Sequence, residues 1–166
     1  MEQQFFEKIS NMIDNAISAY EELLVFYKEK KQALLKQDTN MLALVDEKIV
    51  AQVKYITNLN KRRENFCKEN EIESVKITEL IELAQKECPD FEEVYEQQKV
   101  KIRNIADELA LVEKANVELL KHSLTMSDKL LDIIISAAGS QKDSYDQHGK
   151  NIEANKITIG SIVEEA

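Results

Sequence analysis

His122 and His148 are the two histidines of this chain, and they are the side chains best suited to bind a metal ion or to transfer protons. Glu118 stands four residues before His122, so the two would share one face of a helix. Metal sites in helical bundles use a Glu-x-x-His pair from each of two helices, and neither histidine completes such a pair. We therefore expect a histidine that lies at the surface or makes hydrogen bonds between helices, and we expect no metal site.

The carboxylates that could serve acid–base catalysis stand side by side in the sequence, as Glu21-Glu22, Glu92-Glu93 and Asp107-Glu108. Adjacent residues of a helix point in different directions, so such pairs do not converge on one proton. The sequence also contains no phosphate-binding glycine loop, no dinucleotide fingerprint and no nucleophile elbow. We expect neither an enzyme nor a cofactor.

The net charge of −9 is concentrated in one region of the chain. Residues 71–99 carry nine acidic and three basic side chains, a net of −6, whereas residues 1–70 balance eleven against eleven. Nucleic acid would require a basic stripe to displace counterions from its phosphates. The densest basic run, Lys61-Arg62-Arg63, is followed closely by Glu64 and Glu69, so we expect no nucleic-acid partner.

The first residues, Met1 to Lys8, lack the basic and apolar regions of a secretory signal. The most apolar stretch, Leu130 to Ala138, contains Asp132 and is far shorter than the ~20 residues that span a bilayer. Cys67 and Cys88 have no metal-binding spacing, which suits free thiols in a reducing compartment. We expect a soluble, cytoplasmic protein without membrane insertion.

Glycine and proline, the residues that most often interrupt helices, are nearly absent before position 139. Pro89 is the single proline, and the three glycines are Gly139, Gly149 and Gly160. This distribution predicts long helices followed by a flexible tail. We expect a helical body at residues 1–138 and a tail at residues 139–166.

Heptad-spaced apolar residues predict the first two helices of the body. One seam runs from Ile9 to Leu34 and a second from Leu42 to Phe66, so we expect helices at residues 3–36 and 40–70. Asp38 or Thr39 could cap the second helix. A connection this short makes the two helices an antiparallel hairpin.

Two further helices are expected after a linker at residues 71–78. The short one covers residues 79–87 and is ended by Pro89. The long one covers residues 90–137, and Asp90-Phe91-Glu92-Glu93 at its start has the spacing of a capping box. Its predicted seam includes Phe91, Val94, Gln98 and Asn116. The expected fold is therefore all-α, an elongated antiparallel hairpin with a short helix and a long third helix in a coiled-coil-like bundle.

Asn116 is a polar residue inside the seam of the last helix, between Val112 and Leu119. A buried polar side chain costs stability, yet it can set the register of two helices because it requires a hydrogen-bonding partner. We expect this structural role for Asn116 rather than direct contact with another protein.

The end of the last helix is apolar over an unusually wide arc. Its apolar side chains are Leu124, Met126, Leu130, Leu131, Ile133, Ile134, Ile135 and Ala137. At 3.6 residues per turn they cover about 200° of the circumference, more than one neighbouring helix can bury. The short helix, a second copy of the chain or another protein could cover the remainder.

The tail is mostly polar but carries a late apolar cluster, Ile157, Ile159, Ile162 and Val163. These side chains are too few to offset the entropy lost when the tail becomes ordered by itself. We expect the cluster to become ordered on a partner, and the alternative is an inert solubilising tail.

The order of these parts resembles the FlgN family of flagellar type III export chaperones. Residues 116–120, Asn-Val-Glu-Leu-Leu, match an Asn-x-x-Leu-Leu pattern of that family, and Tyr145 and Gly149 match its Tyr-x-x-x-Gly spacing. Two positions depart from the family pattern. Asp146 replaces the glycine that usually follows the tyrosine, and the turn has Gln37-Asp38 where Gly-Asp is common.

The resemblance implies a cytoplasmic, ATP-independent chaperone that binds hook-filament junction proteins, prevents their premature assembly and delivers them to the export gate. The residues expected to contact the client or the gate are Leu124, Met126, Leu130, Ile133, Ile134, Tyr145, Gly149, Ile157, Ile159 and Ile162. The competing hypothesis is a structural coiled-coil adaptor that forms a homodimer through the same helices and has no export role.

Overall fold

The computed structural model describes residues 3–72 and 76–140, and helices are the only regular secondary structure in that part of the chain. The helices are α1 (Gln3–Lys36), α2 (Thr39–Glu69), α3 (Ile77–Glu87) and α4 (Glu92–Ser140), with a 3-10 turn, η1 (Pro89–Phe91), before α4. The all-α prediction is confirmed. The chain divides into two compact units, Met1–Lys121 and His122–Ala166, and α4 contributes residues to both.

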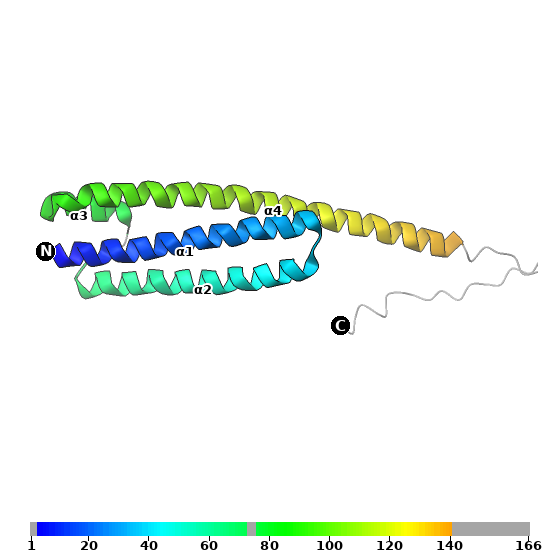
Figure 1. Ribbon diagram of the computed structural model, residues 1–166, viewed down its shortest axis with the longest axis horizontal. Helices are drawn as coiled ribbons and strands as arrows, with labels where there is room; N and C mark the ends of the chain where they lie inside the picture. Colours follow the sequence, from blue (N-terminus) through cyan, green and yellow to red (C-terminus); the bar gives the residue numbers. More distant parts are fainter. Residues whose placement is uncertain (1–2, 73–75, 141–166) are drawn as a thin grey trace, which may run out of the picture. The chain divides into compact units, whose positions relative to one another are not determined.

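The first unit is built around α1, which lies between α2 and α4 (Figure 1). α1 and α2 form the predicted antiparallel hairpin, because Lys30 pairs with Asp46 at 2.7 Å while Gln52, further along α2, bonds the carbonyl of Ala19 at 2.8 Å. α1 therefore has two faces to bury, one against each neighbour.

The turn between α1 and α2 satisfies the backbone groups at both helix ends. Asp38 accepts a hydrogen bond from the Met41 amide at 2.9 Å, so it is the N-cap of α2. The amides of Gln37 and Asp38 bond the carbonyls of Leu34 and Ala33, the pattern of a Schellman motif. Gln37 has φ 55°, in the left-handed region that this motif normally fills with glycine.

The end of α2 repeats this arrangement. The amides of Glu71 and Ile72 bond the carbonyls of Lys68 and Cys67, and Glu71 has φ 59°. A chain without glycine before Gly139 thus still makes two left-handed turns, each with a residue that fits the conformation less well than glycine.

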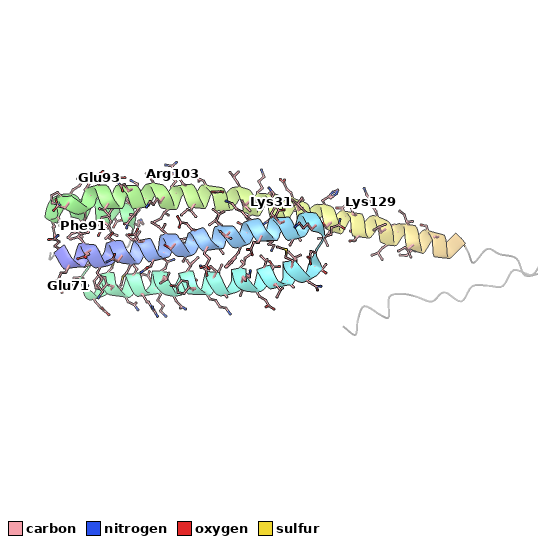
Figure 2. All side chains as sticks on the ribbon, viewed as in Figure 1. Lys31, Glu71, Phe91, Glu93, Arg103 and Lys129 are labelled. Carbon is pink, nitrogen blue, oxygen red and sulfur yellow. The ribbon has the colours of Figure 1, made fainter. Side chains whose placement is uncertain are left out.

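The main apolar core lies at the end of the bundle where α1 begins. Its fully buried side chains come from four helices, including Phe6 and Ile13 of α1, Cys67 of α2, Leu80 of α3 and Tyr95 of α4. The rings of Phe6 and Phe91 stack with centroids 5.9 Å apart, and Phe91 marks this end in Figure 2. The buried side chains of the short helix α3 belong to this cluster.

α4 runs parallel to α1 and contacts it through polar side chains. The Tyr95 hydroxyl donates to the Phe6 carbonyl at 2.9 Å, and the Gln98 amide donates to the Ser10 carbonyl at 3.1 Å. Gln98 also donates to the Ser10 hydroxyl at 3.0 Å and to Asp14 at 2.9 Å. Residue numbers rise together along α1 and α4 in these bonds, so the two helices run in the same direction.

Two predictions about the start of α4 are wrong. Val94 is exposed and Tyr95 is fully buried, because the hydroxyl of Tyr95 finds an acceptor in α1 and the ring can enter the core. The predicted capping box at Asp90 is absent, because Asp90 lies inside η1. The N-cap of η1 is Cys88, and its side chain makes no capping hydrogen bond. Pro89 fixes its own φ at a helical value and so begins the turn earlier than the box would.

Candidate protein-binding surface

The part of α4 that belongs to the second unit, residues 122–140, is called the arm below. Seven large apolar side chains of the arm are between 47% and 65% exposed. They are Leu124, Met126, Leu130, Leu131, Ile133, Ile134 and Ile135. In the first unit, exposed apolar residues of α4 such as Val100 and Leu111 stand singly, so the arm is where they gather.

The helical period places these seven side chains on one broad face. Ile133, Ile134 and Ile135 are consecutive and therefore about 100° apart, which spreads the face over more than half of the circumference. The remaining sector is polar and includes Asp128, Lys129 and Asp132; Lys129 projects from the arm in Figure 2.

Small residues occupy the centre of the apolar face. Ser123 and Ser127 lie on the line that continues the α4 seam beyond Asn116 and Leu119, and the Ser127 hydroxyl donates to the Ser123 carbonyl at 3.1 Å. That bond satisfies the hydroxyl within the helix itself. Ser127 consequently presents little polarity to an approaching apolar side chain, and larger Leu and Ile residues lie on either side of it.

Five of the predicted site residues lie on the arm, and the other five lie outside the described residues. Leu124, Met126, Leu130, Ile133 and Ile134 all lie on the exposed face of the arm. Leu131 and Ile135, equally exposed, belong with them and were absent from the predicted set, although the same apolar arc contained the signal for both. The predicted residues Tyr145, Gly149, Ile157, Ile159 and Ile162 lie outside the described residues.

Asn116 belongs to the first unit and is not part of the arm. Its side chain is buried, and its Nδ2 donates to the Tyr27 carbonyl of α1 at 3.1 Å. Asn116 thus contacts another helix of the same unit.

Tyr27, Cys67 and Tyr95, which all lie in the bundle, have pKa values raised above their ordinary values. Burial raises the pKa of the Tyr95 hydroxyl and of the Cys67 thiol, and burial together with Glu113 raises the pKa of Tyr27. Tyr95 and Cys67 lie in the main core cluster. Their shifts therefore report tight packing and do not mark a reaction centre.

Residues 3–72 and 76–140 contain neither a metal-binding cluster nor a membrane-spanning helix. No group of three or more His, Cys, Asp or Glu side chains in these ranges could hold a metal ion. None of the helices described there combines the length and the apolar character that a membrane span requires. What the described residues offer is a wide apolar surface on a helix.

Comparison with known proteins points to one family. The family model described as FlgN protein matches residues 1–153, which include all four helices and the first part of the tail. No curated protein and no solved structure matches the chain. The family consists of chaperones rather than enzymes, and its members act on flagellar proteins. With the match extending over most of its length, the chain belongs to the FlgN family, which indicates a flagellar export chaperone.

Proposed function

We propose that this protein is a cytoplasmic chaperone that binds hook-filament junction proteins through the apolar face of its arm, prevents their premature assembly and aids their delivery to the type III export gate. One observation carries the proposal: seven large apolar side chains of one helix are all exposed. Monomeric proteins rarely leave so contiguous an apolar face uncovered unless it binds something.

The shape of the surface suits a helical client. An apolar helix face binds an amphipathic helix by side chains at intervals of three and four residues, and Leu130, Ile133, Ile134 and Ala137 have this spacing. Burying three or four Leu or Ile side chains contributes ~5 to 10 kcal/mol before ordering costs are subtracted. A client that assembles through helical termini would have those termini covered.

The tail is proposed to extend the binding site. Ile157, Ile159 and Ile162 would add apolar contacts to the client, and Tyr145 with Gly149 would contact the client or the export gate. The support for this part is the family's Tyr-x-x-x-Gly spacing and the position of the tail directly after the arm.

The arm is tested by calorimetric titration of a junction protein into the full chain. The double variant Leu130→Ser, Ile134→Ser should bind at least about tenfold more weakly, because two apolar contacts worth more than 1.4 kcal/mol together are lost. The matched control Lys129→Ser, Asp132→Ser changes the polar side of the same helix turns and should stay within about twofold. Equal affinities for the two variants would refute the role of the arm.

The tail is tested separately by a chain shortened to end at Ala138. We expect this chain to keep its fold, because every buried residue of the described part precedes position 138, and to bind the client and support export less well. Full binding and full export by the shortened chain would remove the tail from the site.

Light scattering distinguishes the chaperone from the alternative, a homodimeric adaptor. A monomer that forms a one-to-one complex with a junction protein supports the chaperone. A tight dimer that ignores junction proteins supports the adaptor.

A further inference from the structure

The exposed face of the arm raises the question of what covers it before a client arrives. Seven exposed Leu, Ile and Met side chains on one helix would promote self-association if nothing covered them. A segment already joined to the arm is the occupant at the highest local concentration. Short flexible linkers give effective concentrations of about 1 mM, well above ordinary concentrations of a free protein.

The chain supplies such a segment immediately after the arm. α4 ends at Ser140, and the remaining residues contain Ile152, Ile157, Ile159, Ile162 and Val163 among polar neighbours. Apolar side chains are therefore clustered in the last part of the tail, where a return towards the arm can bring them to it.

The length of the tail permits that return. Ile134 lies six residues before the end of α4, which corresponds to ~9 Å at 1.5 Å per residue. Residues 141–156 can span up to about 50 Å when extended, far more than Ile157 needs to reach Ile134. Residues 157–163 would then cover ~23 Å if extended, and the stretch from Leu124 to Ile135 is ~17 Å long. The two apolar stretches are matched in length.

One pair of opposite charges can form between the two stretches. Asp128, Lys129 and Asp132 lie on the polar sector of the arm. In the tail, Lys156 directly precedes Ile157, whereas Glu164 and Glu165 follow Val163. A tail that returns antiparallel to α4 brings Lys156 near the level of Asp132, where attraction adds to the apolar contact.

We propose that Ile157, Ile159 and Ile162 of the same chain cover the apolar face of the arm in the free protein. The contact is intramolecular and needs no other protein. A client would have to take its place on the arm, and the released isoleucines would then be available to the client; this use of the contact rests on the proposed function. The tail would thus keep the arm shielded until a client binds.

Amide hydrogen exchange of the full-length protein without any client tests the proposal. The variant Ile157→Ser, Ile159→Ser, Ile162→Ser should exchange the amides of residues 122–137 about tenfold faster, as for a contact formed in nine molecules of ten. The matched control Asn151→Ser, Asn155→Ser, Thr158→Ser changes polar residues of the same segment and should leave the exchange unchanged. Amides of α1 and α2 should exchange alike in all three proteins, which verifies that the bundle is intact.

Two results would overturn the proposal. Identical exchange of residues 122–137 in the wild-type protein and the triple isoleucine variant means that the tail does not cover the arm. Protection of the arm that rises with protein concentration means that a second copy covers it. Because no client is present, either result leaves the calorimetric test of client binding unaffected, and a failure of client binding leaves this measurement valid.

Discussion

Asn116 of α4 donates a hydrogen bond from Nδ2 to the backbone carbonyl of Tyr27 in α1 at 3.1 Å, with only 2% of its surface exposed. Tyr95 makes the corresponding bond to Phe6 near the start of α4. Positions 95 and 116 differ by 21 residues, and so do positions 6 and 27. This equals three heptads, the repeat by which two helices keep the same faces together along a left-handed supercoil.

We propose that Asn116 sets the register between α1 and α4, and the variant Asn116→Leu tests it. The Oδ1 of Asn116 is buried without a hydrogen-bond partner among the described residues, so leucine should leave the free energy of unfolding unchanged or raise it by up to about 1 kcal/mol. Without the directional bond, α4 should populate more than one position along α1. Nuclear magnetic resonance should then show extra amide signals for α4.

The matched control for that experiment is Val112→Leu, which changes a half-buried apolar residue one turn earlier. It should keep a single set of amide signals. If Asn116→Leu also gives a single sharp set, Asn116 has no role in register.

Ile13 and Ile134 allow the same substitution to be compared in the core and on the arm. Ile13 is 0% exposed and Ile134 is 61% exposed. Ile13→Ala should lower the free energy of unfolding by about 2 to 5 kcal/mol, because it leaves a cavity in a packed core. Ile134→Ala should change it by less than about 0.5 kcal/mol. Urea unfolding measures both values. Similar decreases in the free energy of unfolding would show that Ile134 is packed as tightly as a core residue in the free protein, which contact with the tail alone would not produce.

The raised pKa of Tyr95 predicts that the protein loses stability at alkaline pH. Burial, followed by the charges of Cys67 and Cys88, raises the pKa of Tyr95 above its ordinary value of 10.0. Above pH 10 the unfolded chain therefore releases the phenolic proton while the folded chain retains it. The free energy of unfolding is unaffected by Tyr95 below that pH and should fall by up to about 1.4 kcal/mol per pH unit above it.

The variant Tyr95→Phe is the control for the alkaline transition. It should cost about 1 kcal/mol at neutral pH, because the bond to the Phe6 carbonyl is lost, and it should make the decline above pH 10 shallower. Some decline should remain, since the pKa values of Tyr27 and Cys67 are raised as well. Urea titrations between pH 8 and 11 measure the slopes, and equal slopes in both proteins would contradict this role of Tyr95.

The left-handed backbone conformation of Gln37 predicts that glycine at this position stabilises the protein. Its φ of 55° places a residue with a side chain where a Schellman motif favours glycine. Gln37→Gly should raise the free energy of unfolding by about 0.5 to 1 kcal/mol, seen as a higher melting temperature. Lys36→Gly, one residue earlier and still helical, should lower it by a similar amount. A lower melting temperature for Gln37→Gly would contradict the argument.

The helices could be predicted because their signals are local. The heptad spacing of α1 and α2, the cap at Asp38 and the helix-ending proline at position 89 each act within a few residues of the sequence. The exposed face of the arm was predictable for a similar reason, since three consecutive isoleucines cannot all face one neighbour.

The pairing of α4 with α1 could not be predicted in the same way. The choice of Tyr95 rather than Val94 for the core depends on a carbonyl of Phe6, which is 89 residues away. The same holds for Gln98, whose acceptors Ser10 and Asp14 lie in a helix far back in the sequence. Spacing along α4 shows which residues lie on one face, but it does not show which helix that face will meet.

The central position of α1 also has a consequence for the order in which the protein folds. α1 meets α2 over separations such as 33 residues, from Ala19 to Gln52, but meets α4 over separations of 84 to 89 in the hydrogen bonds of Tyr95, Gln98 and Asn116. Closing the shorter loop loses less chain entropy, and during synthesis α2 leaves the ribosome well before α4. We expect the α1–α2 hairpin to form first. The face of α1 that packs against α4 would then stay exposed to solvent until α4 has been synthesised. Pulse-labelled hydrogen exchange during refolding should then protect α2 amides before those of α4, and simultaneous protection would show that the three helices condense together.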